Sequence, residues 1–208
     1  MSALARYFKQ RGDSVAGYDH TESPLTQQLQ SEGIAVHYDD NPSKIPHDID
    51  LCIYTPAVPT TTAEYQYIAS HGIEIRKRSQ VLGELTRGTL CIAVAGSHGK
   101  TTTTAMIAHL LHTAGEKYNT FLGGIGKNLG SNMHCEPGAR YTVVEADEYD
   151  RSFLQLHPHI AVITATDPDH LDIYGTHDAM LDAFEQFACQ TDGDGHVIIK
   201  NSASLLSR

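Results

Sequence analysis

The sequence predicts an α/β protein with mainly parallel β-sheets, and three observations lead to this fold class. Short apolar runs alternate along the chain with longer segments of helical period, which is the pattern of repeated strand–helix units. One apolar run, residues 90–95, leads directly into a glycine-rich loop and a helical segment. Hydrophobic residues make up 40% of the 208 residues, which is enough for a packed core. At about 150 residues per domain, this length fits one large domain or two small ones.

The first region, residues 1–87, is expected to open with a helix. Residues 2–11 have a helical period that ends at Gly12. Ser23 followed by Pro24 predicts a second helix, ending near Glu32, because serine caps helix N-termini and proline fits the first turn. The other expected elements are strands at residues 15–18, 34–36, 50–54 and 73–75 and a helix at residues 63–70. Residues 76–87 are expected to connect this region to the next.

The second region, residues 88–208, begins with the apolar strand 90–95 and its loop, and a helix follows over residues 102–114. Further expected elements are strands at residues 119–122, 141–145, 160–164 and 196–200 and a helix at residues 179–189. This order of strands and helices predicts a second parallel sheet of the kind found in phosphate-loop ATPases.

The charge balance excludes several classes of function. The chain has 15 Lys and Arg against 25 Asp and Glu, for a net charge of −10. Binders of nucleic acid and of membrane surfaces need a basic face, so neither partner is expected. No apolar run approaches the roughly 20 residues of a membrane span, and the N-terminus lacks the apolar core of a signal peptide. We therefore expect a soluble, cytoplasmic protein that holds any anionic ligand by a local device.

The four cysteines do not form a metal-binding pattern. Cys52, Cys91, Cys135 and Cys189 are widely spaced, without a CxxC pair, so a structural zinc site is not expected. Cys52 and Cys91 lie inside apolar runs, which predicts buried free thiols.

The strongest chemical signal is the loop Gly96-Ser97-His98-Gly99-Lys100-Thr101, which with Thr102 joins a strand to a helix. Backbone N–H groups of such a loop and the helix N-terminus bind phosphate. Lys100 would reach the β- and γ-phosphates of ATP, and the Thr101 hydroxyl would bind Mg²⁺. Only two residues separate the glycines, whereas the usual loop has four. The alternative is a tight glycine-rich turn without a ligand.

Glu145 ends the apolar strand 141–145, where a phosphate-loop fold places an acid associated with the metal. An acidic run follows, and its Glu148 and Asp150 leave two interpretations open: a part in the site, or a solvated turn. His170 follows the strand 160–164 within the segment Asp169–Asp172. Because the carboxyl ends of parallel strands share one edge of the sheet, His170 is a candidate second metal ligand. Its alternative is a structural histidine.

Three segments in this order and spacing resemble the Mur ligases of peptidoglycan synthesis: residues 95–103, 144–150 and 169–172. Residues 121–126 are similar to a glycine-containing substrate loop of that family, and residues 55–59 with Lys77 and Arg78 fit its N-terminal domain. The resemblance covers essentially the whole chain and is nearest to the branch that joins L-alanine to UDP-N-acetylmuramate.

The resemblance implies a Rossmann-like domain that binds the UDP-linked substrate (residues 1–87) and a central ATPase domain (residues 88–208). It implies that the substrate carboxylate takes the γ-phosphoryl group of ATP, and that the amine of L-alanine attacks the resulting acyl phosphate. By motif match, Thr101 and Glu145 would hold one Mg²⁺, while Glu145 and His170 would serve a second. Lys100 and His98 would act in catalysis, and His98 would do so by contact with substrate or phosphate.

The resemblance also implies that both regions are incomplete. The family's glycine-rich opening loop would precede Met1, and the adenine contacts and a third domain would follow Arg208. We therefore expect this chain to bind ATP weakly with Mg²⁺ and to form no peptide bond alone. Two other functions stay open: a murein-peptide ligase that joins a tripeptide to the same UDP-sugar, and a nucleotide-binding module without catalysis.

Overall fold

The computed structural model describes residues 1–201 and 204–207, and the chain divides into two compact units, Met1–Val81 and Leu82–Arg208. The division falls inside helix α4 (Arg78–Thr86). Residues 76–87 were expected to connect the two regions; the division between the units falls within them, and helix α4, which the sequence did not predict, makes up most of this connection. Ser202, Ala203 and Arg208, which belong to the predicted second domain, lie outside the described residues. No helix among the described residues is long and apolar enough to cross a membrane.

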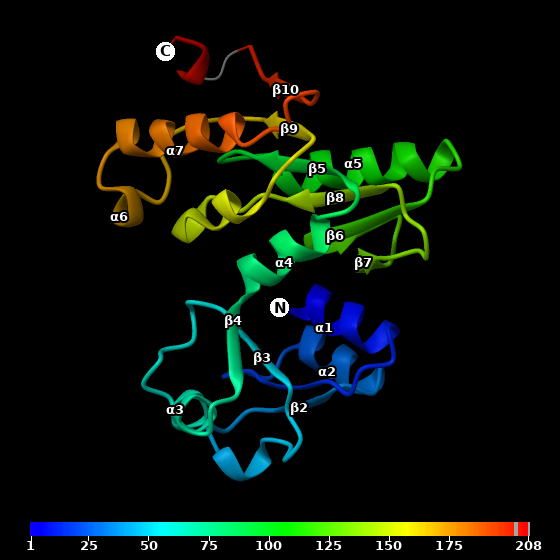
Figure 1. The fold of residues 1–208 in the computed structure, drawn as a ribbon, viewed down its shortest axis with the longest axis vertical. Coiled ribbons are helices and arrows are strands. Elements are labelled where there is room, and N and C mark those ends of the chain that lie inside the picture. The colour runs from blue at the N-terminus through cyan, green and yellow to red at the C-terminus, as the bar shows by residue number, and fades with distance from the viewer. Residues whose placement is uncertain (202–203, 208) are drawn as a thin grey trace. The chain divides into compact units, whose positions relative to one another are not determined.

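The first unit alternates helices with short strands, as the sequence predicts (Figure 1). Its elements are α1 (Ser2–Gln10), β1 (Ala16–Tyr18), α2 (Pro24–Ser31), β2 (Ala35–His37), the 3₁₀ helix η1 (Pro42–Lys44), β3 (Leu51–Tyr54), α3 (Ala63–Ser70) and β4 (Glu74–Lys77). Strand β1 pairs with β2 and β3 pairs with β4, both in parallel. Parallel pairing with helical connections is the arrangement of a βα fold.

Local sequence explains the helix boundaries of this unit. Ser23 and Thr26 form a capping box at the start of α2: the Ser23 hydroxyl accepts from the Thr26 N–H at 3.2 Å, and the Thr26 hydroxyl accepts from the Ser23 N–H at 2.9 Å. The predicted helix start at Ser23–Pro24 is therefore confirmed. Arg6 of α1 is buried and donates to both carboxylate oxygens of Glu32, at 2.7 and 2.9 Å, which ties α1 to the end of α2.

The second unit is built on one six-stranded sheet in the order β10-β9-β5-β8-β6-β7. All neighbours are parallel except β7, which is antiparallel to β6. Its elements after α4 are β5 (Leu90–Ala95), α5 (Lys100–Thr113), β6 (Tyr118–Gly126), β7 (Ser131–His134), β8 (Tyr141–Glu145), the 3₁₀ helix η2 (Tyr149–Gln155), β9 (Ile160–Ile163), α6 (Leu171–Tyr174), α7 (His177–Cys189), β10 (His196–Ile199) and the 3₁₀ helix η3 (Ser204–Ser207). The α/β fold class with mainly parallel sheets is confirmed.

Several boundaries differ from the prediction. Strand β7 was not expected, β6 runs on to Gly126, and α5 begins at Lys100 instead of residue 102. The short helix α6 was also missed. Of the four free cysteines, Cys91 is buried as predicted, whereas Cys52 is only half-buried, because β3 belongs to a two-stranded sheet whose side chains are partly covered.

Strand register brings the candidate site together. β5 lies in the interior of the sheet between β9 and β8, and its residues Val94 and Ala95 are fully buried. Val94 pairs with Glu145 of β8, and Ala95 pairs with Ile163 of β9. The loop after β5, the carboxylate of Glu145 and the segment after β9 therefore all lie at the same carboxyl edge of the sheet, where ligands bind in open α/β folds.

Candidate active site

The loop between β5 and α5 has a backbone that depends on its two glycines. Gly96 has φ of 135° and Gly99, the N-cap of α5, has φ of 83°, both in the region that favours glycine. A Cβ on Gly96 would lie 2.3 Å from the hydroxyl oxygen of Thr164 and 2.8 Å from the backbone nitrogen of Ala165. The close approach of the segment after β9 thus leaves no room for a side chain at position 96.

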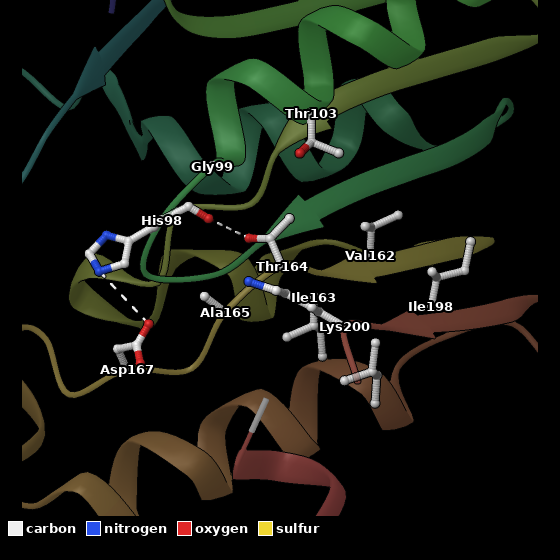
Figure 2. A pocket seen from close by; sticks show the side chains of 11 residues that line it. His98, Gly99, Thr103, Val162, Ile163, Thr164, Ala165, Asp167, Ile198 and Lys200 are labelled. Atoms are coloured by element: carbon white, nitrogen blue, oxygen red, sulfur yellow. Dashed lines mark hydrogen bonds and ion pairs between the residues drawn. The ribbon is translucent and has the colours of Figure 1, made fainter. Parts of the chain in front are cut away.

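That same segment holds the loop in place through hydrogen bonds. The Ser97 N–H donates to the Ala165 carbonyl at 3.1 Å, and the Asp167 N–H donates to the Ser97 hydroxyl at 2.9 Å. The Thr164 hydroxyl donates to the His98 carbonyl at 2.5 Å (Figure 2). The His98 ring lies on the exposed side, 3.8 Å from an Asp167 carboxylate oxygen. These hydrogen bonds hold the loop between β5 and α5 against the segment that follows β9.

Lys100, in the first turn of α5, folds back over the loop. Its ammonium donates to the Gly96 carbonyl and to the Oε1 atom of Glu148, both at 2.8 Å. Glu148 is 0% exposed, while the Lys100 side chain is 20% exposed. A solvated turn was one of the two interpretations left open for Glu148, and its burial excludes that one. A carboxylate this deeply buried needs a partner of opposite charge, and Lys100 supplies it.

Thr101 and Glu145 meet at the start of α5, as their predicted shared role requires. The Thr101 hydroxyl donates to Glu145 Oε2 at 3.1 Å, and Glu145 Oε1 accepts from the Gly123 N–H at 2.7 Å. A hydroxyl and a carboxylate are hard oxygen ligands of the type that Mg²⁺ binds. Thr102, the next residue of the helix, is exposed beside them.

His170 belongs to a second cluster with Glu148 and Asp169, whose ligand atoms all lie within 4.8 Å of one another. The Glu145 carboxylate is not part of this cluster, so the pairing of Glu145 with His170 stays a prediction. His170 has φ of 50° at the start of α6. Glu148 Oε2 is buried and has no hydrogen-bond partner among the described residues. An unpartnered buried carboxylate oxygen beside a histidine fits a divalent cation.

Tyr174 links the acidic segment after β9 to the acidic segment after β8 by a hydrogen bond. Its hydroxyl donates to the Glu148 carbonyl at 2.6 Å. Burial raises the pKa of Tyr174 to about 12, and the nearby Glu148 carboxylate adds to the rise. The hydroxyl therefore keeps its proton at neutral pH and acts as a donor. This hydrogen bond joins helix α6, which carries Tyr174, to the turn after β8.

A hollow of about 510 Å³ adjoins the loop on the side of β9 and β10. Figure 2 shows Val162 and Ile198 forming an apolar wall, with His98 and Asp167 at the rim and Lys200 extending toward the loop. The hollow can accept a partly apolar group of a ligand whose phosphates lie on the loop.

Two protein-family models match the chain. The model of the Mur ligase middle domain matches residues 94–207, and the model described as "Mur ligase family, catalytic domain" matches residues 1–89. Together they cover both compact units.

Curated relatives extend this similarity along the chain. UDP-N-acetylmuramate–L-alanine ligase of Phocaeicola vulgatus is 50% identical over 99% of this chain and 46% of its own length. The enzyme of the same name from Parabacteroides distasonis is 48% identical over 100% of this chain and 46% of its own length. The chain thus spans about half the length of the curated relatives it matches.

Two solved structures share the fold over the whole chain. UDP-N-acetylmuramate-alanine ligase of Thermotoga maritima has a TM-score of 0.89 at 30% identity, with 48% of that chain covered. UDP-N-acetylmuramate:L-alanyl-gamma-D-glutamyl-meso-diaminopimelate ligase of Neisseria meningitides has a TM-score of 0.90 at 25% identity, with 69% of that chain covered.

Proposed function

The chain belongs to the Mur ligase family, and from this premise we propose that it is part of an ATP-dependent ligase that joins L-alanine to UDP-N-acetylmuramate. The observation that carries the proposal is the position of Lys100 and Thr101, at the end of a glycine-dependent loop, beside Glu145 at the end of β8. The curated relatives that span the whole chain have this activity in their names, which supports the choice of substrates.

In this proposal, the loop 96–102 binds the phosphates of ATP through backbone N–H groups and the N-terminus of α5. Lys100 neutralises charge on the phosphoryl group as it passes to the substrate carboxylate. That step turns a poor electrophile into an acyl phosphate, and the amine of L-alanine then attacks its carbonyl carbon while phosphate leaves. His98, exposed at the rim of the hollow, is placed to contact substrate or phosphate.

Two groups of residues would hold Mg²⁺. Thr101 and Glu145 form one, and His170 contributes to the other, with Glu145 as predicted or with Glu148 and Asp169 beside it. A bound Mg²⁺ neutralises and orients phosphate oxygens. The protein's own part is to hold these oxygen and nitrogen ligands on fixed strand ends.

The domain roles follow the same proposal. Residues 1–87 would form the Rossmann-like domain for the UDP-linked substrate, with residues 55–59, Lys77 and Arg78 near the ligand, and residues 88–208 the ATPase domain. The use of ATP and a UDP-linked sugar argues for a location in the cytoplasm.

A second candidate keeps the same UDP-sugar but takes a tripeptide. The similarity to the Neisseria tripeptide ligase favours this candidate. In both candidates the loop 96–102 would bind the phosphates of ATP, so the loop does not distinguish them. The test supplies L-alanine or the tripeptide L-alanyl-γ-D-glutamyl-meso-diaminopimelate to the full protein encoded by the gene and measures phosphate release. Release with L-alanine alone supports the proposal, and release with the tripeptide alone overturns it.

Binding of ATP by the present chain tests the shared part of both candidates. Calorimetric titration with ATP and Mg²⁺ should detect weak binding by the unmodified chain. Lys100→Ala should lower the affinity, because Lys100 is the cation that reaches the terminal phosphates. Unchanged binding by this variant would contradict the assignment of the loop.

A further inference from the structure

Glu148 is the one fully buried carboxylate of the described candidate site, and the sequence left open whether it takes part in the site, without giving it a role. It lies three residues beyond Glu145, is 0% exposed and pairs with Lys100 at 2.8 Å. Burying a carboxylate costs several kcal/mol unless it is paired, and this one is placed beneath the lysine expected to bind phosphate. A glutamate is rarely fully buried unless it is paired.

The backbone of Glu148 is fixed independently of Lys100. Its carbonyl accepts from the Tyr174 hydroxyl at 2.6 Å and from the Arg151 N–H at 3.0 Å. The guanidinium of Arg151 lies over the Tyr174 ring, 5.4 Å from its centre. The carboxylate therefore stands on a rigid support, whereas Lys100 reaches it through a flexible four-carbon chain.

The ammonium of Lys100 can bind a phosphate without leaving Glu148. An ammonium has three N–H donors. Two of them are directed to the Gly96 carbonyl and to Glu148 Oε1, which leaves one donor for a phosphate oxygen. Because two of its three N–H donors already bond to the protein, the Lys100 ammonium loses less conformational entropy when it binds a phosphate.

The same carboxylate also lies near the candidate metal ligand. Glu148 Oε1 is 3.9 Å from His170 Nε2. Glu148 thus stands between the phosphate-binding lysine and the histidine of the second cluster, at the centre of the site.

We propose that Glu148 is a positioning residue that holds the Lys100 ammonium in place for the terminal phosphates of ATP. This inference rests on the proposed function, in which the loop 96–102 binds ATP. It concerns the ion pair between Glu148 Oε1 and the Lys100 ammonium, so its effect on ATP affinity must disappear when Lys100 is removed, whereas an effect through a cation held by Glu148, Asp169 and His170 would persist.

The test measures the affinity of the full protein encoded by the gene for ATP and for AMP, each with Mg²⁺, by calorimetry. Glu148→Gln keeps the shape and removes the charge, and Glu185→Gln, on the exposed side of α7, is the matched control. Glu148→Gln should weaken ATP binding about tenfold, as expected for a lost charged hydrogen bond. AMP binding should change less than about twofold, because AMP lacks the phosphates that Lys100 reaches.

A double-mutant cycle then asks whether the effect passes through Lys100. In a Lys100→Met background, Glu148→Gln should cause no further loss of ATP affinity, since the positioned group is gone. A merely structural role would weaken ATP and AMP alike and would persist in this background. Circular dichroism checks that each variant is folded. If Glu148→Gln unfolds, Glu148→Asp, one methylene shorter, takes its place under the same criteria.

The outcomes separate the inference from the proposed function. Unchanged or tighter ATP binding by Glu148→Gln, equal losses for ATP and AMP, or an additive loss with Lys100→Met would each overturn the positioning role. If the unmodified full protein does not bind ATP, the proposed function fails and the inference fails with it. A loss of affinity for ATP but not for AMP in Glu148→Gln, absent in the Lys100→Met background, supports both the positioning role and the proposed function.

Discussion

Replacing Gly96 with alanine should destabilise the second unit more than the same change at another glycine with positive φ. At Gly96, φ is 135°, and a Cβ would lie 2.3 Å from the Thr164 hydroxyl oxygen and 2.8 and 2.9 Å from the Ala165 nitrogen and oxygen. Two of these three atoms belong to the backbone that follows β9. Because β9 is hydrogen-bonded to β5 in the sheet, this backbone cannot move aside without disturbing the strand pairing.

The size of the effect follows from two separate costs. An alanine held at a disfavoured φ costs about 1–3 kcal/mol, and overpacking a close contact costs about another 1–3 kcal/mol. Gly115, after α5 in the same unit, is the matched control: its φ is 73° and a Cβ there would meet no atom within 4 Å. Gly115→Ala should therefore show the backbone cost alone, about 1–2 kcal/mol.

Hydrogen-exchange mass spectrometry in urea is the appropriate assay, because it follows peptides of each unit separately. Peptides from α5 and β8 should lose protection in Gly96→Ala beyond the loss in Gly115→Ala. A difference of 1.4 kcal/mol corresponds to about tenfold in the opening equilibrium. Equal losses in the two variants would refute the reasoning that the segment after β9 excludes a side chain from position 96.

Three further predictions address metal binding, an ion pair and pH. Glu145→Gln should reduce the gain in ATP affinity that Mg²⁺ provides, because a neutral amide is a poorer ligand; titrations with and without Mg²⁺ check this, and an unchanged gain contradicts it. Glu32→Gln should destabilise the first unit by about 1–3 kcal/mol, since Arg6 is buried and Glu32 partly exposed; protection of α1 peptides that stays unchanged would argue against it. Burial raises the pKa of Cys91 from 9.0 to about 12, so the unfolded chain releases this proton first. Stability should therefore fall as pH rises from 9 toward 12. Urea unfolding at pH 8 and pH 10 should show a smaller loss of stability in Cys91→Ala than in the unmodified chain. An identical loss in the two proteins would disprove that Cys91 causes it.

Prediction of the fold succeeded where local patterns and packing agree. The apolar runs of β5 and β8 and the Ser23–Pro24 helix start were each predicted within a residue or two of their observed positions. Strand β7 was missed because Ser131–His134 has little apolar character, and it forms on the edge that β6 offers. Helix α4 was missed because Gly83 interrupts its pattern. A Cβ at Gly83 would lie 2.3 Å from the Gln155 carbonyl, so the glycine serves a tertiary contact.

The sequence by itself determined the glycine-rich loop between β5 and α5, the carboxylate at the end of β8 and the family resemblance. These features are contiguous or follow directly from strand ends, and a parallel sheet always gathers its carboxyl ends at one edge. Only the tertiary structure decided that Glu148 is buried against Lys100. The two residues are 48 positions apart, and they meet because β5 and β8 are neighbours in the sheet. Whether a carboxylate in an acidic run is solvated or paired depends on that long-range packing, which no local pattern records.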